Sequence, residues 1–160
     1  MTDFELHGGC TCRAVRYRIT RSPLIVHCCH CRWCQRETGS AFVLNAVVEA
    51  DSVELEGAAP ELVNTPSASG KGQKISRCPT CRVALFSNYA GSGDAMRFVR
   101  IGTLDNPDAL APDVHIYTES KVPWVALPPG VPAFPKFYDP KQVWSDAARE
   151  RFRAARARPA

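Results

Sequence analysis

Three groups of cysteines in the first 81 residues could bind a metal ion. They hold all eight cysteines of the 160-residue chain, and the groups span Cys10–Cys12, Cys28–Cys34 and Cys78–Cys81. Thiols at such short spacing in a reduced protein are typical zinc ligands. The chemistry to expect is therefore that of zinc held by thiolates.

The two outer groups have the spacing of two halves of a closed zinc site. Side chains two residues apart in an extended chain project to the same side, so Cys10 and Cys12 can bind one metal. Cys78 and Cys81 form a turn-like knuckle whose sulfurs converge, and Pro79 stiffens that turn. Together they predict a four-cysteine structural zinc that ties the N-terminus to the middle of the chain.

The middle group offers three well-spaced thiols rather than four. Cys29 and Cys31 share one side of an extended chain, and Cys34 follows at ligand spacing. Cys28 and His30 project the other way, so we expect a small buried thiol and a histidine bonded to a backbone carbonyl, with metal ligation as the alternative for both. A zinc with three protein ligands keeps a fourth position for chemistry. Three thiolates weaken its Lewis acidity, so this position suits a thiol substrate better than ionisation of water.

Length and composition argue against a disulfide-stapled secreted protein. A 160-residue chain that is 45% hydrophobic fits one domain, which buries roughly 70% of the surface that its unfolded chain exposes. Residues Met1–Leu6 show no basic start and no apolar run, so we expect no secretory signal. No apolar stretch reaches the about 18 residues that would span a membrane. We therefore expect a cytoplasmic protein with reduced thiols and no membrane partner.

The excess positive charge is concentrated near the C-terminus. Of a net charge of +4, most comes from residues 146–158, where five arginines face two acidic residues. This segment lacks the interleaved aromatic residues of a nucleic-acid platform, which argues against a nucleic-acid partner. We expect one domain over residues 1–138, followed at 139–160 by an exposed basic helix or frayed tail.

The elements that must position the cysteines are mostly strands. In Ala14–Thr20 hydrophobic and basic residues alternate, which predicts a half-buried strand. Helical pattern is limited to a turn or two after Cys34, a turn at 107–110 and a helix from about Pro140, and prolines make 107–140 a wrapping arm. We predict a mainly β protein, an antiparallel sandwich or open barrel. Further strands are expected at 24–28, 42–48, 52–55, 73–76, 84–89, 97–101 and 114–117.

Further short motifs accompany the cysteine groups. They are Gly9 directly before Cys10, the run Gly39-Ser40-Ala41-Phe42, the run Gly102-Thr103-Leu104-Asp105, the pair His115-Ile116 and the pair Pro123-Trp124. Together with the cysteine spacing, these motifs resemble the glutathione-dependent formaldehyde-activating enzyme family, also called the CENP-V/GFA domain. The resemblance covers roughly residues 4 to 137.

The resemblance implies a β-tent (Mss4-like) fold with two zinc ions per chain. It implies a carbon–sulfur lyase that adds glutathione reversibly to formaldehyde and gives S-(hydroxymethyl)glutathione, or acts on a related pair of aldehyde and thiol. A homodimer is left open. The implied structural zinc ligands are Cys10, Cys12, Cys78 and Cys81, and the implied catalytic zinc ligands, near the glutathione site, are Cys29, Cys31 and Cys34.

Basic side chains near these motifs could bind the carboxylates of a glutathione-like ligand. The candidates are Arg32, Arg36, Lys71 and Lys74. Three aromatic residues, Trp33, Phe42 and Trp124, could wall the site but are expected to fill the core. The alternation pattern gives His27 and His115 structural roles.

The chain departs from the family pattern around the second knuckle. Arg77 replaces a usual aromatic residue and Arg82 a usual glycine. Glycine favours a left-handed turn, which Arg82 can adopt at a cost of about 1 kcal/mol, so the metal site should survive.

Two alternative functions follow from the same features. A non-catalytic zinc-binding interaction module could use the arginine-rich tail to contact a partner. A methionine sulfoxide reductase would need a redox cysteine outside the zinc sites, and none follows Cys81.

Overall fold

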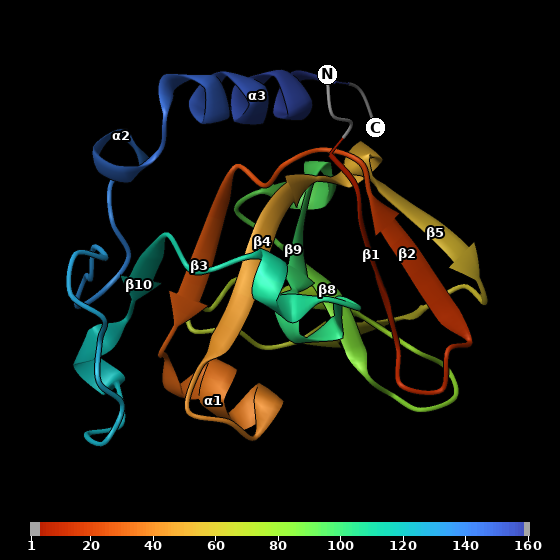
Figure 1. Cartoon of the computed structure of the whole chain (residues 1–160), viewed down its shortest axis with the longest axis horizontal. Helices are drawn as coiled ribbons and strands as arrows, with labels where there is room; N and C mark the ends of the chain where they lie inside the picture. The colour runs from red at the N-terminus through yellow and green to blue at the C-terminus, as the bar shows by residue number, and fades with distance from the viewer. Residues whose placement is uncertain (1–3, 159–160) are drawn as a thin grey trace.

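Two β-sheets form the body of the molecule in the computed structural model, which describes residues 4–158. The smaller sheet has the order β1-β2-β5 and the larger one β10-β3-β4-β9-β8-β7-β6 (Figure 1). All pairs of neighbouring strands are antiparallel except β10 and β3, which are parallel. The strands are β1 (Leu6–Gly9), β2 (Val15–Ile19), β3 (Ile25–Cys29), β4 (Val43–Glu49), β5 (Val53–Gly57), β6 (Glu61–Thr65), β7 (Gln73–Arg77), β8 (Ala84–Tyr89), β9 (Met96–Arg100) and β10 (Val114–Ile116).

The burial pattern of each strand follows from what covers its two faces. In β2 the apolar residues are buried and the arginines between them are partly exposed, because one face packs on the core and the other meets water. In β3 all five residues are buried, because both faces are covered: Val26 belongs to one hydrophobic cluster, and Ile25 and Cys29 belong to the other. The core forms two hydrophobic clusters, one around β2 and the other around the end of β3 and the C-terminal elements.

The prediction of a mainly β fold is confirmed, and each predicted strand has a counterpart. Two strands were not predicted. β1 contains two glycines, and a Cβ on Gly8 would lie 2.4 Å from the ring of Tyr17, so close packing rather than strand propensity explains the residue. β6 is an edge strand that is mostly exposed, so it lacks the buried apolar alternation that marks a strand in a sequence.

The helices are short, and both α1 and α3 contact β4, an inner strand of the larger sheet. The predicted helix from Pro140 is divided into two, because Ser145 caps a second helix by accepting a hydrogen bond from the Ala148 N–H at 3.1 Å. The helices are α1 (Arg32–Thr38), α2 (Pro140–Val143) and α3 (Asp146–Ala157). Single 3₁₀ turns are η1 (Ala50–Ser52), η2 (Gly93–Ala95), η3 (Ile101–Thr103), η4 (Pro107–Ala109) and η5 (Thr118–Ser120).

The predicted basic helix is present over 146–157 and most of its residues are exposed, but one side of it is docked on the sheet, so the segment is not a frayed end. Ala148 and Ala155 of α3 are buried, and the helix contacts β4. In Figure 1 it runs along one edge of the sheets, opposite α1. None of the helices within residues 4–158 has the length and hydropathy needed to cross a bilayer.

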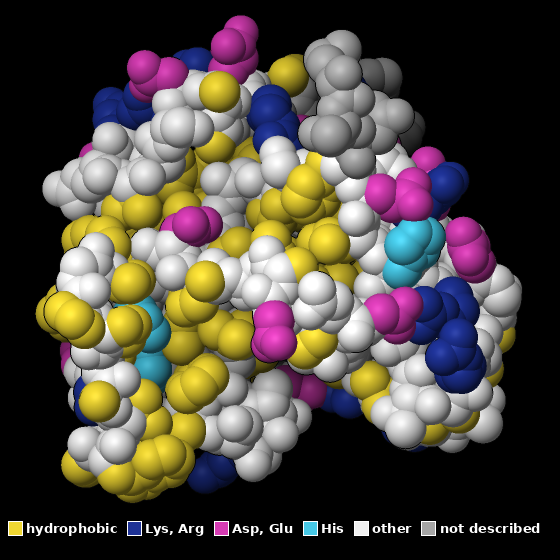
Figure 2. All heavy atoms as spheres, in the orientation of Figure 1, with side chains coloured by type: hydrophobic (Ala, Val, Ile, Leu, Met, Phe, Trp, Pro, Cys, Tyr) yellow, Lys and Arg dark blue, Asp and Glu magenta, His cyan; other side chains and the backbone are white. Residues whose placement is uncertain are grey.

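The proline-rich arm wraps one side of the larger sheet, as predicted. It runs beside β10, where the His115 N–H donates to the Pro132 carbonyl at 2.8 Å and the Phe134 N–H donates to the His115 carbonyl at 2.9 Å. Figure 2 shows hydrophobic side chains gathered on the half of this face where β3, β10 and the arm lie. Basic and acidic side chains mix over β2 and β5, and Arg18 pairs there with Glu54.

Candidate functional site

Four cysteine sulfurs come together, two from the turn between β1 and β2 of the smaller sheet and two from the turn between β7 and β8 of the larger sheet. The Sγ atoms of Cys10, Cys12, Cys78 and Cys81 all lie within 4.8 Å of one another. The Cys10–Cys12 distance is 3.5 Å and the Cys12–Cys78 distance is 3.6 Å. Tetrahedral zinc with Zn–S bonds of about 2.3 Å places its sulfurs about 3.8 Å apart. These four residues, which the sequence grouped, could therefore hold a zinc ion.

Both halves of this cluster are tight turns with an arginine in the left-handed region. Arg13 and Arg82 have φ angles of 66° and 65°. The Arg13 N–H donates to the Cys10 carbonyl at 3.0 Å, and the Arg82 N–H donates to the Cys78 carbonyl at 3.1 Å. The left-handed turn expected at Arg82 is thus formed, and the same turn recurs at Arg13.

A second cluster contains Cys29, Cys31 and Cys34, whose sulfurs also lie within 4.8 Å of one another. Cys29 ends β3, and Cys31 is the N-cap of α1, where its sulfur accepts a hydrogen bond from the Cys34 N–H at 3.3 Å. All three are buried, and all eight cysteines of the chain are free. These three sulfurs could hold a zinc ion as well. Within residues 4–158 no fourth His, Cys, Asp or Glu side chain joins this group.

The three thiols of this cluster differ in pKa. Hydrogen bonds from the Cys29 and Cys34 thiols, helped by the backbone N–H groups of Cys34 and Trp33, lower the pKa of Cys31 well below its ordinary value, although burial opposes this. Hydrogen bonding to Cys31 and burial raise the pKa of Cys29. Cys31 is therefore the thiol of this cluster that ionises most readily, and three sulfurs that lie this close form a donor set that fits a divalent cation.

Cys28 and His30 lie on the other face of the chain from this cluster. The Cys28 Sγ is 3.5 Å from His30 Nε2, and His30 Nε2 is 2.9 Å from His115 Nδ1. The expectation that the His30 side chain bonds a backbone carbonyl is wrong: its partner is His115, which lies opposite Cys28 in the parallel register of β10. The alternative of metal ligation has the geometry that it needs, because the ligand atoms of Cys28, His30 and His115 all lie within 4.8 Å of one another. Burial lowers the pKa of His30 to about 4 and also lowers that of His115, so the pair is neutral near pH 7.

A cavity of about 700 Å³ opens onto the three-cysteine cluster. Cys29, Cys31 and Cys34 are among its lining residues. Trp33 also lines it and is 46% exposed, while Trp124 does not line it and is 78% exposed, so the prediction that both fill the core is wrong.

The family model of the glutathione-dependent formaldehyde-activating enzymes matches residues 5–120, more than half of the chain. This protein belongs to that family. A similar solved structure is the crystal structure of a Rhodobacter sphaeroides protein, a structural-genomics target, with 20% sequence identity and a TM-score of 0.49. That similarity covers 66% of this chain and 95% of the other. No curated protein matches this chain.

Part of the cavity wall lies outside the residues that the formaldehyde-activating enzyme model matches. Phe137, Trp144 and Phe152 line the cavity from the C-terminal segment. Motif reasoning missed them because they follow the last recognisable motif, and the arginines around Phe152 disguise its apolar face.

The basic candidates are distributed unevenly around this site. Lys71 lines the cavity, whereas Arg32 donates to the Gln35 side chain at 2.8 Å and Lys74 lies 3.5 Å from Asp94. Arg36 is exposed on α1. Among the described residues, these three are not in the cavity lining. The lining includes three basic residues that the sequence did not suggest, namely Lys141, Arg149 and Arg153.

Proposed function

We propose that this member of the formaldehyde-activating family is a zinc-dependent carbon–sulfur lyase. It would add glutathione, or a similar thiol, reversibly to formaldehyde or a related aldehyde. The observation that carries the proposal is the meeting of three buried sulfurs in the lining of a cavity, without a fourth His, Cys, Asp or Glu ligand among the described side chains. A site of this kind keeps one coordination position for a substrate.

The roles of the chain's own residues follow from their positions. Zinc bound at this site would hold the substrate sulfur as a thiolate, the nucleophilic form. Cys29, Cys31 and Cys34 would fix that metal at one end of the cavity, and the cavity would bring the aldehyde carbonyl beside the sulfur. In the addition, a carbon–sulfur bond forms and the thiol proton ends on the carbonyl oxygen, so no oxidant or reductant is needed.

Basic side chains support a thiol that carries carboxylates. Lys71 and Arg153 line the cavity and are exposed, so they can meet an anionic group at its mouth. The second zinc, at Cys10, Cys12, Cys78 and Cys81, would be structural, because four sulfurs complete its coordination.

Exchange NMR tests the proposal directly. Zinc-loaded protein should accelerate the exchange between free formaldehyde and S-(hydroxymethyl)glutathione. The acceleration by the Cys31→Ser variant should be at least about 100-fold smaller than that by wild type. Cys28→Ser is the matched control and should retain the activity, because Cys28 lies on the other face of β3. No acceleration across several aldehydes and thiols, with two zinc ions bound, would instead favour a non-catalytic zinc-binding module.

A further inference from the structure

The cavity above the three cysteines is much larger than formaldehyde requires. Its volume of about 700 Å³ falls in the range of sites that enclose ligands of drug-like size, about 300–1,000 Å³. Formaldehyde has a single carbon atom and would leave nearly all of this space to water or to a second ligand.

Aromatic side chains from two parts of the chain line the cavity. On the sheet side are Tyr89 and Phe98, whose ring centroids are 4.7 Å apart in an edge-on arrangement. On the C-terminal side are Trp144 and Phe152, whose centroids are 5.4 Å apart, together with Phe137. Water forms few hydrogen bonds with such aromatic walls. An apolar ligand that displaces this water removes both its own apolar surface and that of the walls from contact with water.

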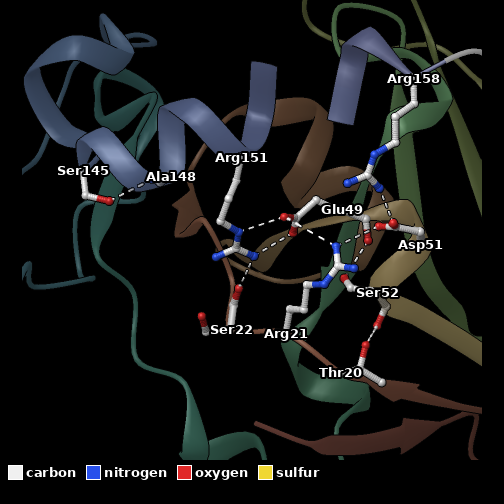
Figure 3. A network of polar contacts seen from close by, with 10 residues as sticks. All are labelled: Thr20, Arg21, Ser22, Glu49, Asp51, Ser52, Ser145, Ala148, Arg151 and Arg158. Atoms are coloured by element: carbon white, nitrogen blue, oxygen red, sulfur yellow. Dashed lines mark hydrogen bonds and ion pairs between the residues drawn. The ribbon is translucent and has the colours of Figure 1, made fainter. Parts of the chain in front are cut away.

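Ion pairs fix the C-terminal wall to the sheet. In Figure 3 Arg151 of α3 points at Glu49 at the end of β4, and its Nε and Nη2 atoms lie 2.8 and 2.7 Å from the two carboxylate oxygens. The same guanidinium donates to the Ser22 carbonyl at 2.8 Å, and Arg158 pairs with Asp51 near the end of the helix. The wall is therefore built before any ligand arrives.

Hydrogen bonds hold the near end of this wall as well. The Trp144 indole N–H donates to the Tyr138 hydroxyl at 2.7 Å, and that hydroxyl lies 2.6 Å from His27 Nε2. The Phe137 ring stacks on Tyr138 with centroids 4.7 Å apart. A preformed apolar wall binds its ligand without the entropic cost of ordering side chains.

We propose that the aldehyde taken by this enzyme has a bulky apolar body, either an aromatic ring or an alkyl chain of several carbons. The body packs between the strand wall of Tyr89 and Phe98 and the C-terminal wall of Trp144 and Phe152, and its carbonyl meets the thiol at the three cysteines. The inference rests on the proposed function and names its substrate class. The exposed basic residues at the mouth leave the apolar interior to the aldehyde, because they attract the charged groups of the thiol.

Binding of unreactive alcohols tests the cavity without any turnover. Replacing Trp124 by Phe leaves Trp33 and Trp144, both in the cavity lining, as the two fluorescent tryptophans. Titration of zinc-loaded W124F protein with ethanol, butanol, hexanol and octanol should show affinity rising about fourfold per methylene group. Affinity that does not change with chain length would overturn the inference.

Aldehyde selectivity gives a second, independent measurement. With glutathione as the thiol, kcat/KM for 3-phenylpropanal should exceed that for formaldehyde by at least about tenfold, and Phe152→Ala should lower this ratio at least about fivefold. The matched control is Phe4→Ala, which removes a ring packed on the other hydrophobic cluster and should keep the ratio. Circular dichroism checks that α3 persists, and Phe152→Leu, which keeps an apolar side chain, should give an intermediate ratio.

The two experiments separate this inference from the proposed function. Turnover of formaldehyde without chain-length-dependent binding of alcohols would overturn the inference and leave the lyase intact. Alcohol binding that rises with chain length, without thiol addition to any aldehyde, would support the apolar ligand class and contradict the lyase.

Discussion

At the scale of single residues, the backbone is strained at Arg13 and Arg82. Both lie in the turns that bring together Cys10, Cys12, Cys78 and Cys81, here called the outer cluster. Each follows the second cysteine of its pair and adopts a φ angle near 65°. A side chain in this conformation crowds the following carbonyl, which is why glycine favours it. The chain therefore tolerates strain on both sides of the proposed structural zinc.

Replacing Arg82 tests this strain. Arg82→Gly should unfold with a free energy about 1 kcal/mol higher than Arg82→Ala, because both remove the side chain and its ion pair with Glu61 but only glycine relieves the backbone. Urea unfolding of the zinc-loaded variants measures the difference. Arg36 has the ordinary helical conformation of α1, so there the glycine variant should be less stable than the alanine variant, by a similar amount. The same order at both sites would contradict the explanation.

At the scale of elements, α3 is the segment whose arginine-rich composition is most misleading. The side chain of Glu49 is only 4% exposed, and its partner Arg151 stands 102 residues later in the chain. Burial is the largest single influence on the pKa of Glu49 and raises it. The hydrogen bonds from Arg151, the backbone N–H of Glu49 and the charges of Arg151 and Arg21 together outweigh burial, so the pKa is lowered from its ordinary value. Arg151, which the sequence suggests is solvated, thus attaches α3 to the sheet, and α3 contributes to the lining of the cavity.

Acid should weaken this attachment. A carboxylate with a lowered folded-state pKa stabilises the fold above its unfolded pKa of about 4.5, and that stabilisation is lost as the pH falls through the lower folded value. Glu49→Gln should therefore lower the free energy of unfolding by about 2 kcal/mol at pH 7. The difference in free energy of unfolding between wild type and variant should become smaller below about pH 4.5. Urea unfolding across a pH series measures the gap. Glu54→Gln, in an exposed pair with Arg18, should cost less than about 1 kcal/mol.

At the scale of the whole molecule, the two cysteine clusters differ in what they connect. The outer cluster joins the turn between β1 and β2 of the smaller sheet to the turn between β7 and β8 of the larger one. The three-cysteine cluster is local, because six residues from the end of β3 into α1 contain all its ligands. Metal at the outer cluster should therefore stabilise the fold, and metal at the inner one should serve chemistry.

Zinc content and unfolding of two serine variants test this division. Wild type should carry two zinc ions, and Cys81→Ser and Cys31→Ser about one each. Cys81→Ser should lower the free energy of unfolding by several kcal/mol, because it opens the link between the sheets. Cys31→Ser should cost much less, since serine is itself a good N-cap for α1. One zinc in the wild type, or equal destabilisation by both variants, would contradict the assignment.

Sequence alone determined the features that depend on local geometry. Strand alternation placed Cys28 and His30 opposite Cys29 and Cys31, and most strands lie where their period-2 pattern predicts, because side chains alternate along an extended chain whatever surrounds it. Only the tertiary structure decided the partner of His30, which comes from the parallel pairing of β10 with β3. It also decided that the C-terminal segment walls the cavity, because that contact joins Glu49 to Arg151, residues too far apart in the chain for any local pattern to connect.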